Sequence, residues 1–251
     1  MEGRGVFEQA FGMIKQHKLL LAAAVILAVP NIFYSVLQGP YPLWSAILVF
    51  VMQPLQFGGL YMALKAWRNE PLALSQLLYC YLGGRLGRSV LFALAYCGAA
   101  LLTGLAIGLG MVLSSLFGIL ALFGMLAVVF FGLAVLGILI YPMLLAYLDD
   151  TELTVGEAYS QGRRLTEGKF KPLLGIAWGI FWRLGLVAVL PELIVFSLGA
   201  DSPASIVIQA VLSCMVTGYT IVMVTGVWQE LLKEAQSGQA KTGAVDPEVL
   251  S

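Results

Sequence analysis

The chain has 251 residues, of which 60% are hydrophobic and only 11% are charged, and its formal net charge is zero. Charged residues make up about a quarter of an ordinary soluble domain, and the mean hydropathy of this chain is +0.90. The composition therefore excludes an ordinary soluble domain and predicts an all-α, polytopic membrane protein.

Long uncharged stretches predict the transmembrane helices. No charged residue occurs between Lys18 and Lys65 or between Arg88 and Asp149, and each stretch is long enough for two spans of about 20 residues. A third stretch begins at Pro172 and carries only three charges, of which two acids fall in its middle, where a turn is needed. In chain order, the predicted spans are 19–38, 43–66, 87–113, 118–147, 172–198 and 205–229.

A short amphipathic segment precedes each of the three hairpins that these spans form. Its apolar positions follow the spacing i, i+3, i+4, i+7, which is typical of a helix with one apolar face. The positions are Phe7, Ala10, Phe11 and Ile14, then Leu74, Leu77, Leu78 and Tyr81, then Val155, Ala158, Tyr159 and Gly162. We interpret the chain as three repeated units, each a helix on the cytoplasmic membrane surface followed by a hairpin, with these helices near 6–17, 72–83 and 154–166. The alternative is that the segments are loops with incidental helical spacing.

The basic residues predict the orientation. Thirteen of the fourteen Lys and Arg residues lie in the terminal segments or in the loops 65–88 and 148–171, and none lies in the three opposite loops. The exception is Arg183, which lies inside a predicted span. Because positively charged loops stay on the cytoplasmic side, we expect both termini in the cytoplasm. The same basic residues are expected to contact the anionic lipid headgroups of the bilayer.

The two ends of the chain give further expectations. Lys15 and Lys18 precede a long apolar run, but no small-residue cleavage site follows, so we interpret the run as an anchor rather than a signal peptide. Residues 1–235 are expected to form one transmembrane domain. The polar residues 236–251 are expected to form a disordered cytoplasmic tail.

Two stretches resemble a known family, MQPLQFGGLYMALKAWRNEPLALSQLL and YPMLLAYLDDTELTVGEAYSQGRRLTEGKFKPLL. They are similar to uncharacterised six-helix bacterial membrane proteins, a domain of unknown function related in pattern to the membrane domain beside some glycerophosphodiester phosphodiesterases. The shared elements are Pro54, Gly58 and Gly59, the acidic pair Asp149 and Asp150, Ala158, and Gly168 with Lys169. The chain departs from the pattern at its last span, where GYTIVMVTGVWQELLKE replaces an aromatic-rich close. The resemblance implies a multi-pass protein of the bacterial inner membrane and implies no particular activity.

The sequence gives no sign of catalysis or of a bound metal or other cofactor. It contains no nucleophile elbow, zincin motif or phosphate-binding loop, its one histidine is His17, and its three cysteines are scattered singly. We expect neither an enzyme nor a nucleic-acid-binding protein.

Polar residues within the predicted spans are the candidate functional residues. Counted from Pro172, Arg183 lies about 17 Å into a hydrocarbon layer of about 30 Å, which is too deep for easy snorkelling. The other candidates are Asn31, Gln53, Gln56, Thr217 and Glu192. Polar groups in hydrocarbon need hydrogen-bond partners, so we expect these residues to face one another inside the helix bundle. They form either structural contacts between helices or a polar site for a ligand.

Two classes of function remain. The first is a non-catalytic membrane protein that acts by binding membrane or envelope proteins and lipid. The second is a small transporter with a polar midplane site around Arg183. All three units enter the membrane from the same side in this topology, so an inverted pair of repeats is lacking, which favours the first class. A closed, dry interior favours the first class as well, whereas a polar cavity reaching the midplane favours the second.

Overall fold

A computed structural model describes residues 3–37, 42–117, 137–138, 140–150, 152–179 and 203–242. Every regular element within these residues is a helix, and the described part of the chain contains no β-strand. The prediction of an all-α fold is therefore confirmed.

The chain begins with two helices that meet at a sharp corner. α1 (Gly3–Gln16) is followed by α2 (Lys18–Leu37), and the segments Glu8–Gln16 and Lys18–Val29 form an angle of 95°. This bent pair together has the length and composition of a membrane span. Where side chains as well as backbone are described, no single helix is both long and apolar enough to cross a membrane.

A short helix connects two long apolar helices and runs back along the first. α3 (Pro42–Trp67) continues through Pro54, and α4 (Leu86–Phe117) is the second long helix. Between them, η1 (Leu74–Tyr81) packs on α3 at Gly58, where an added Cβ atom would overlap the carbonyl oxygen of Leu77. η1 is a 3-10 helix, although its apolar spacing is that of an α-helix. Because a 3-10 helix rises about 2.0 Å per residue instead of 1.5 Å, η1 reaches further along α3 than an α-helix of equal length.

The second half of the chain contains four described helices. Three of them are short, and the last one is very long. A helix at 140–149 precedes α6 (Val155–Thr166), another helix occupies 170–179, and α8 spans Pro203–Thr242. The predicted spans 118–147 and 172–198 lie largely outside the described residues. α8 corrects the expected start of the disordered tail, because it continues beyond 235 to Thr242 with no proline to end it.

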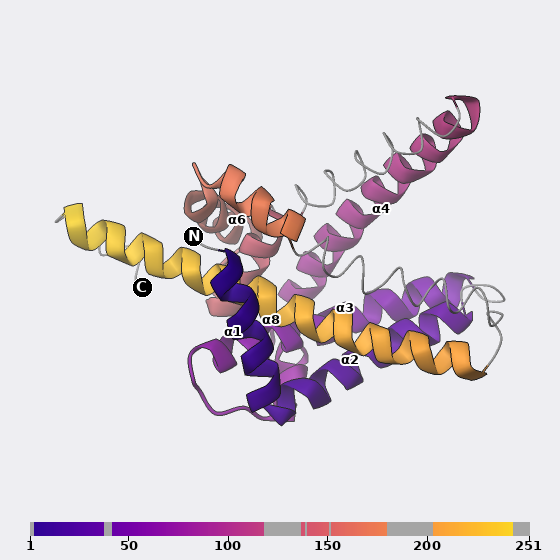
Figure 1. The fold of residues 1–251 in the computed structure, drawn as a ribbon, viewed down its shortest axis with the longest axis horizontal. Coiled ribbons are helices and arrows are strands. Elements are labelled where there is room, and N and C mark those ends of the chain that lie inside the picture. Colours follow the sequence, from indigo (N-terminus) through magenta and orange to yellow (C-terminus); the bar gives the residue numbers. More distant parts are fainter. Residues whose placement is uncertain are drawn as a thin grey trace.

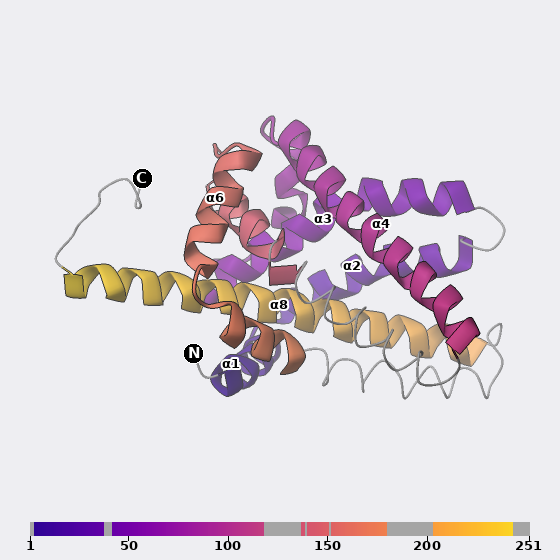
Figure 2. The same ribbon diagram turned by 90° about the horizontal axis from the view of Figure 1, so that it is seen from above.

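α8 is the helix around which the others are arranged (Figures 1 and 2). α2 and α3 lie along its first half and middle, α1 crosses its middle, and α6 lies beside its second half. α4 crosses α3 and then diverges from the group (Figure 1). The amphipathic helices α1 and α6 are therefore grouped at one end of the long helices.

Buried side chains form two groups that share α3, η1 and α8. The first group joins α1, α2, α3, η1 and α8 and includes Ala10, Leu27, Met62 and Met223. The second joins α3, η1, α4, the helix at 140–149, α6 and α8 and includes Phe57, Phe92, Tyr147 and Trp228. In the second group, the rings of Phe92 and Tyr147 stack with their centroids 4.3 Å apart. The three helices common to both groups, α3, η1 and α8, therefore connect the three predicted units.

The three amphipathic segments use their repeated positions in the same way. The second position is buried in each segment, with Ala10, Leu77 and Ala158 exposed by 0%, 3% and 0%. The third position is exposed in each segment and is occupied by Phe11, Leu78 and Tyr159. All three segments are helical, so the alternative of three loops is wrong.

Candidate functional site

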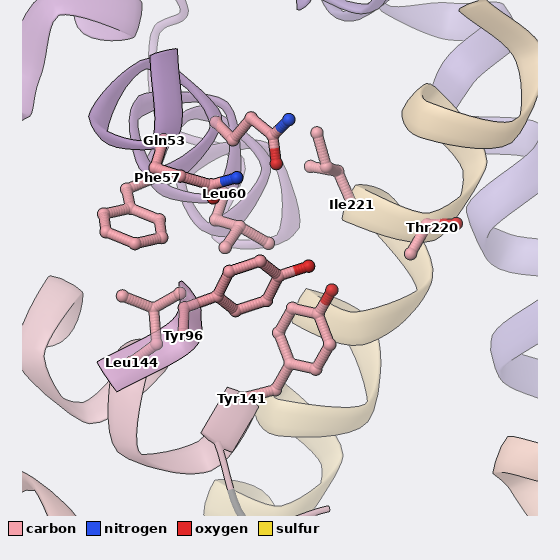
Figure 3. A pocket seen from close by; sticks show the side chains of 9 residues that line it. Gln53, Phe57, Leu60, Tyr96, Tyr141, Leu144, Thr220 and Ile221 are labelled. Carbon is pink, nitrogen blue, oxygen red and sulfur yellow. The ribbon is translucent and has the colours of Figure 1, made fainter. Parts of the chain in front are cut away.

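A small cavity with a mostly apolar wall and a few polar groups lies where α3, α4, the helix at 140–149 and α8 meet (Figure 3). Its volume is about 30 Å³, which leaves room for one or two water molecules. Its walls are formed by Gln53, Gln56, Phe57, Leu60, Tyr96, Tyr141, Leu144, Thr220 and Ile221. The cavity thus joins elements from all three predicted units.

Two glutamines supply the amide groups of this cavity. Gln53 and Gln56 flank Pro54 on α3, and their spacing of three residues places both side chains on one face of the helix. Gln53 is only 5% exposed, and no hydrogen bond joins its amide to another residue in the described part of the chain. Buried amides need hydrogen-bond partners, and the cavity has room for water to supply them.

Two tyrosines supply the hydroxyl groups. The hydroxyls of Tyr96 on α4 and Tyr141 on the helix at 140–149 point toward one another (Figure 3), and the two side chains are hydrogen-bonded. Thr220 also lines the cavity, but its hydroxyl is turned away from the two tyrosines (Figure 3). The polar lining therefore consists of two amides and two phenols.

The backbone of α3 beside the cavity is supported by a side chain from η1. Pro54 has no N–H, so the helix loses one backbone hydrogen bond at this point. The Tyr81 hydroxyl donates to the carbonyl oxygen of Val51 at 2.6 Å, and the N–H of Leu55 donates to the same hydroxyl. Val51 and Leu55 are one helical rung apart, so Tyr81 inserts into the α3 ladder next to the proline and holds η1 against it.

None of the ion pairs of the described residues lines the cavity, and most of them lie near helix ends. Arg68, just after α3, pairs with Asp149 at the end of the helix at 140–149. The Gln229 amide oxygen of α8, oriented by the hydrogen-bond network, accepts from Arg68 Nη2 at 3.3 Å and from Nε at 3.2 Å. Lys169 pairs with Glu234 of α8 at 3.0 Å and lowers the pKa of that carboxyl through this hydrogen bond. These partly exposed pairs align the helix ends and contribute little stability individually.

The polar groups of the cavity can exchange hydrogen bonds with a small ligand. All of its lining side chains are uncharged, and none is a histidine, cysteine or carboxylate that could act as a general base or nucleophile near neutral pH. Within the described ranges, no cluster of three or more His, Cys, Asp or Glu side chains could hold a metal ion. A water molecule or a similarly small polar solute is the ligand that fits.

The structure brings only some of the sequence-predicted residues together. Gln53 and Gln56 line the cavity, whereas Thr217 lies one turn before the lining residues of α8 and does not contact the cavity. Asn31 lies in α2, and its side chain is outside the described part of the structure. The remaining two candidates, Arg183 and Glu192, also lie outside the described residues.

Sequence reasoning missed the two tyrosines of the site. Tyr96 and Tyr141 lie in long apolar runs, where their rings read as ordinary hydrophobic residues. Their hydroxyls were the available signal, because a buried tyrosine hydroxyl usually has a hydrogen-bond partner. The same rule that selected the glutamines therefore applies to these two residues.

Comparisons of the chain with protein-family models, with curated proteins and with solved structures find no match. The resemblance to the six-helix bacterial family stays a prediction from short motifs. The case for a function therefore rests on the geometry of the described residues.

Proposed function

We propose that the chain is a non-catalytic, multi-pass protein of the bacterial inner membrane that acts by binding lipid and another membrane protein. The observation that carries the proposal is the apolar outer face of α4. The residues Leu91, Leu94, Leu101, Leu105, Leu109 and Val112 are each exposed by 53% to 66%. The opposite face of the same helix buries Ser89, Phe92 and Ala93. α4 thus buries a hydroxyl and exposes leucines, which is the reverse of a helix surrounded by water.

Lipid is the surrounding that suits this face. α4 has 32 residues and is therefore about 48 Å long, which exceeds the thickness of about 30 Å of a hydrocarbon layer. It carries no charge after Arg88. Burying a large apolar side chain is favourable by about 1.5–3 kcal/mol relative to leaving it in water. A continuous stripe of such side chains in water promotes association, whereas in a bilayer it contacts acyl chains.

Two other long helices carry similar stripes. On α2, the exposed residues Leu21, Val25 and Val29 follow one another at intervals of four. On α8, Val207, Val211 and Met215 repeat the pattern. Residues four apart share a helix face, so each helix presents one apolar stripe to its surroundings. These stripes support a bundle whose outside contacts lipid, with six spans in three hairpins.

The C-terminal half of this face of α4 also fits a partner helix, whereas its N-terminal half, around Leu91 and Leu94, contacts lipid. Gly104 and Gly108 form a G-x-x-x-G pattern, which allows close contact between transmembrane helices. Among the described residues, no atom lies within 4 Å of a Cβ atom added at Gly108, so this position is open to another helix. We assign it to a transmembrane helix of a partner membrane protein.

The size of the cavity also supports a non-catalytic role. Pockets for small-molecule ligands have volumes of about 300–1,000 Å³, whereas this cavity measures about 30 Å³. It is therefore suited to water-mediated contacts between helices. Such contacts satisfy buried amides without a substrate.

Position-specific quenching by brominated lipid tests the proposal. A fluorescent label is attached at Leu105→Cys or Phe92→Cys in a chain whose native cysteines are replaced by serine, and the protein is reconstituted in bilayers. We expect strong quenching at position 105, which is exposed, and weak quenching at position 92, which is 1% exposed. Equal quenching at both positions, or release of the native chain from membranes by alkaline carbonate, would contradict the proposal.

The polar lining of the cavity favours a second candidate, a small permease. Two amides and two phenols from three helices line the cavity and leave room for one or two water molecules. Such an arrangement occurs in narrow polar pathways as well as in hydrated helix bundles. Stopped-flow measurements of water and glycerol entry into proteoliposomes separate the two functions. If the chain is a permease, the flux exceeds that of empty liposomes, and Gln53→Leu abolishes the excess. If the cavity is structural, the flux equals that of empty liposomes.

A further inference from the structure

Two cations enclose a pair of stacked tyrosines beside the start of α4. Lys65 Nζ lies 5.4 Å from the ring centroid of Tyr61, and the rings of Tyr61 and Tyr79 stack with centroids 3.7 Å apart and an interplanar angle of 10°. Arg85 completes the stack, with its Cζ atom 4.4 Å from the centroid of Tyr79. The four side chains thus alternate as cation, ring, ring and cation, and connect α3 to the segment between η1 and α4.

The local backbone keeps the Arg85 guanidinium in this place. Gly83 has a φ of 65°, and a Cβ atom added to it would lie 3.0 Å from Nη1 of Arg85. The guanidinium therefore lies over the bare backbone of Gly83 on one side and near the Tyr79 ring on another. A guanidinium on an aromatic face is held in orientation while its N–H groups stay free for an anion.

The charge on Arg85 has no protein counterpart in the described part of the chain. The other cation of the stack, Lys65, pairs with Glu70 at 3.0 Å, and Arg88 lies 3.6 Å from Glu152. No carboxylate, and no acceptor of a side-chain hydrogen bond, faces Arg85 among the described residues. A half-buried guanidinium with five N–H donors and no acceptor is suited to a negatively charged oxygen ligand.

The surroundings of Arg85 are apolar rather than charged. Leu82 and Leu86 flank it in sequence and are exposed by 56% and 44%. Further along α4, the exposed Leu91 and Leu94 begin the apolar outer stripe. A ligand seated here meets a cation first and then a continuous apolar surface, and this order matches a phosphate joined to an acyl chain.

We propose that Arg85 binds the phosphate of an anionic phospholipid whose acyl chain lies on the outer face of α4. This inference rests on the proposed membrane function and names the lipid site. The planar guanidinium donates two hydrogen bonds to the phosphate oxygens, and the stacked tyrosines hold it at the level of the headgroups. The negative headgroup balances the charge that the protein leaves unpaired.

Native mass spectrometry of the detergent-purified full chain tests the proposal with phosphatidylglycerol, phosphatidylcholine and inorganic phosphate as separate ligands. We expect phosphatidylglycerol to bind in preference to phosphatidylcholine, and Arg85→Gln to weaken its binding about fivefold or more, since one basic residue near a headgroup contributes about this much. Binding of inorganic phosphate with equal affinity would show a free anion site and overturn the lipid assignment.

Three further variants keep the test independent of folding. Tyr79→Leu removes the ring under Arg85 and is expected to weaken phosphatidylglycerol binding, whereas Tyr79→Phe keeps the ring and is expected to retain it. Arg163→Gln, on the exposed face of α6, removes one positive charge elsewhere and is the matched control. A loss in Arg163→Gln as large as that in Arg85→Gln would overturn the specific site.

Alkaline carbonate extraction of the native chain separates the two proposals. If the chain stays in the membrane but shows no preference for phosphatidylglycerol that depends on Arg85, the lipid site is wrong and the membrane function stands. If the chain is extracted as a soluble protein, the membrane function itself is wrong.

Discussion

The hydroxyl of Tyr81 takes part in the backbone hydrogen bonding of α3 beside Pro54. It donates to Val51 and accepts from Leu55, so one side chain serves both groups of a single helical rung. A proline within a helix leaves backbone groups that neighbouring side chains or water must satisfy. Tyr81 therefore links the local effect of a proline to the position of η1.

We expect Tyr81→Phe to lower the free energy of unfolding by about 1 kcal/mol, because the carbonyl of Val51 and the amide of Leu55 lose a partner that they share. Thermal unfolding in detergent measures the change. Tyr159→Phe is the matched control, since its ring is exposed on α6 and its loss of a hydroxyl should leave the midpoint unchanged. An equal effect in both variants would contradict the role of Tyr81.

The residues of the cavity could be predicted only in part from the sequence. Gln53 and Gln56 stand out because amides are rare in an apolar run, and both line the cavity. Tyr96 and Tyr141 did not stand out, because one hydroxyl on a large ring barely changes the hydropathy of a segment. Their convergence also depends on how α4 crosses α3, which no local pattern encodes.

At the scale of elements, the contact of η1 with α3 depends on the absence of a side chain. Gly58 lies against the backbone of Leu77, and backbone atoms cannot move aside as a flexible side chain can. Gly108 on α4 has open space around it instead. These two helical glycines therefore differ in what a methyl group would do.

Gly58→Ala is expected to destabilise the protein by about 2–3 kcal/mol, since overpacking at a backbone contact forces helices apart. Gly108→Ala is expected to be neutral or to stabilise by up to about 1 kcal/mol, because alanine is the better helix former. Both effects are read from the midpoint of thermal unfolding. A similar loss in the two variants would show that the Gly58 contact is unimportant.

α6 begins with a complete capping box that is sensitive to pH. The N–H and the hydroxyl of Thr154 each donate to Glu157 Oε2 at 2.7 Å, and the N–H of Glu157 donates back to the Thr154 hydroxyl at 3.3 Å. These hydrogen bonds, led by the one from the Thr154 backbone, hold the pKa of Glu157 below its ordinary value of 4.5. The ionised carboxylate is therefore the form that caps the helix.

The lowered pKa fixes the sign of the pH dependence. The capping contribution is complete above about pH 4.5 and is lost as the pH falls through the lowered pKa of Glu157, because protonation weakens the acceptor. We expect the protection factors of the first-turn amides of α6 against hydrogen exchange to fall on acidification more in the native chain than in Glu157→Gln, whose amide does not titrate. An identical fall of the protection factors in both proteins would contradict the role of the carboxylate.

For the whole molecule, the sequence predicted the helices better than their packing. The predicted spans 43–66 and 87–113 correspond to α3 (Pro42–Trp67) and α4 (Leu86–Phe117), because uncharged runs bounded by basic residues mark helix length directly. The 3-10 form of η1 was not predicted, since its apolar spacing is that of an α-helix, and neither was its contact with Gly58. Arg183, the strongest single signal in the sequence, lies outside the described residues, and its role inside the bundle stays a prediction.

The central claim is that the chain crosses the inner membrane in three hairpins with both termini in the cytoplasm. Labelling of single cysteines in intact cells with a membrane-impermeant maleimide tests it directly, using Gly39→Cys, Ala200→Cys and Ser237→Cys in a chain whose native cysteines are replaced by serine. We predict labelling at positions 39 and 200 from outside the cell, and labelling at position 237 only after the cells are permeabilised. Protection of position 39 or 200 in intact cells, together with labelling of position 237, would contradict the account.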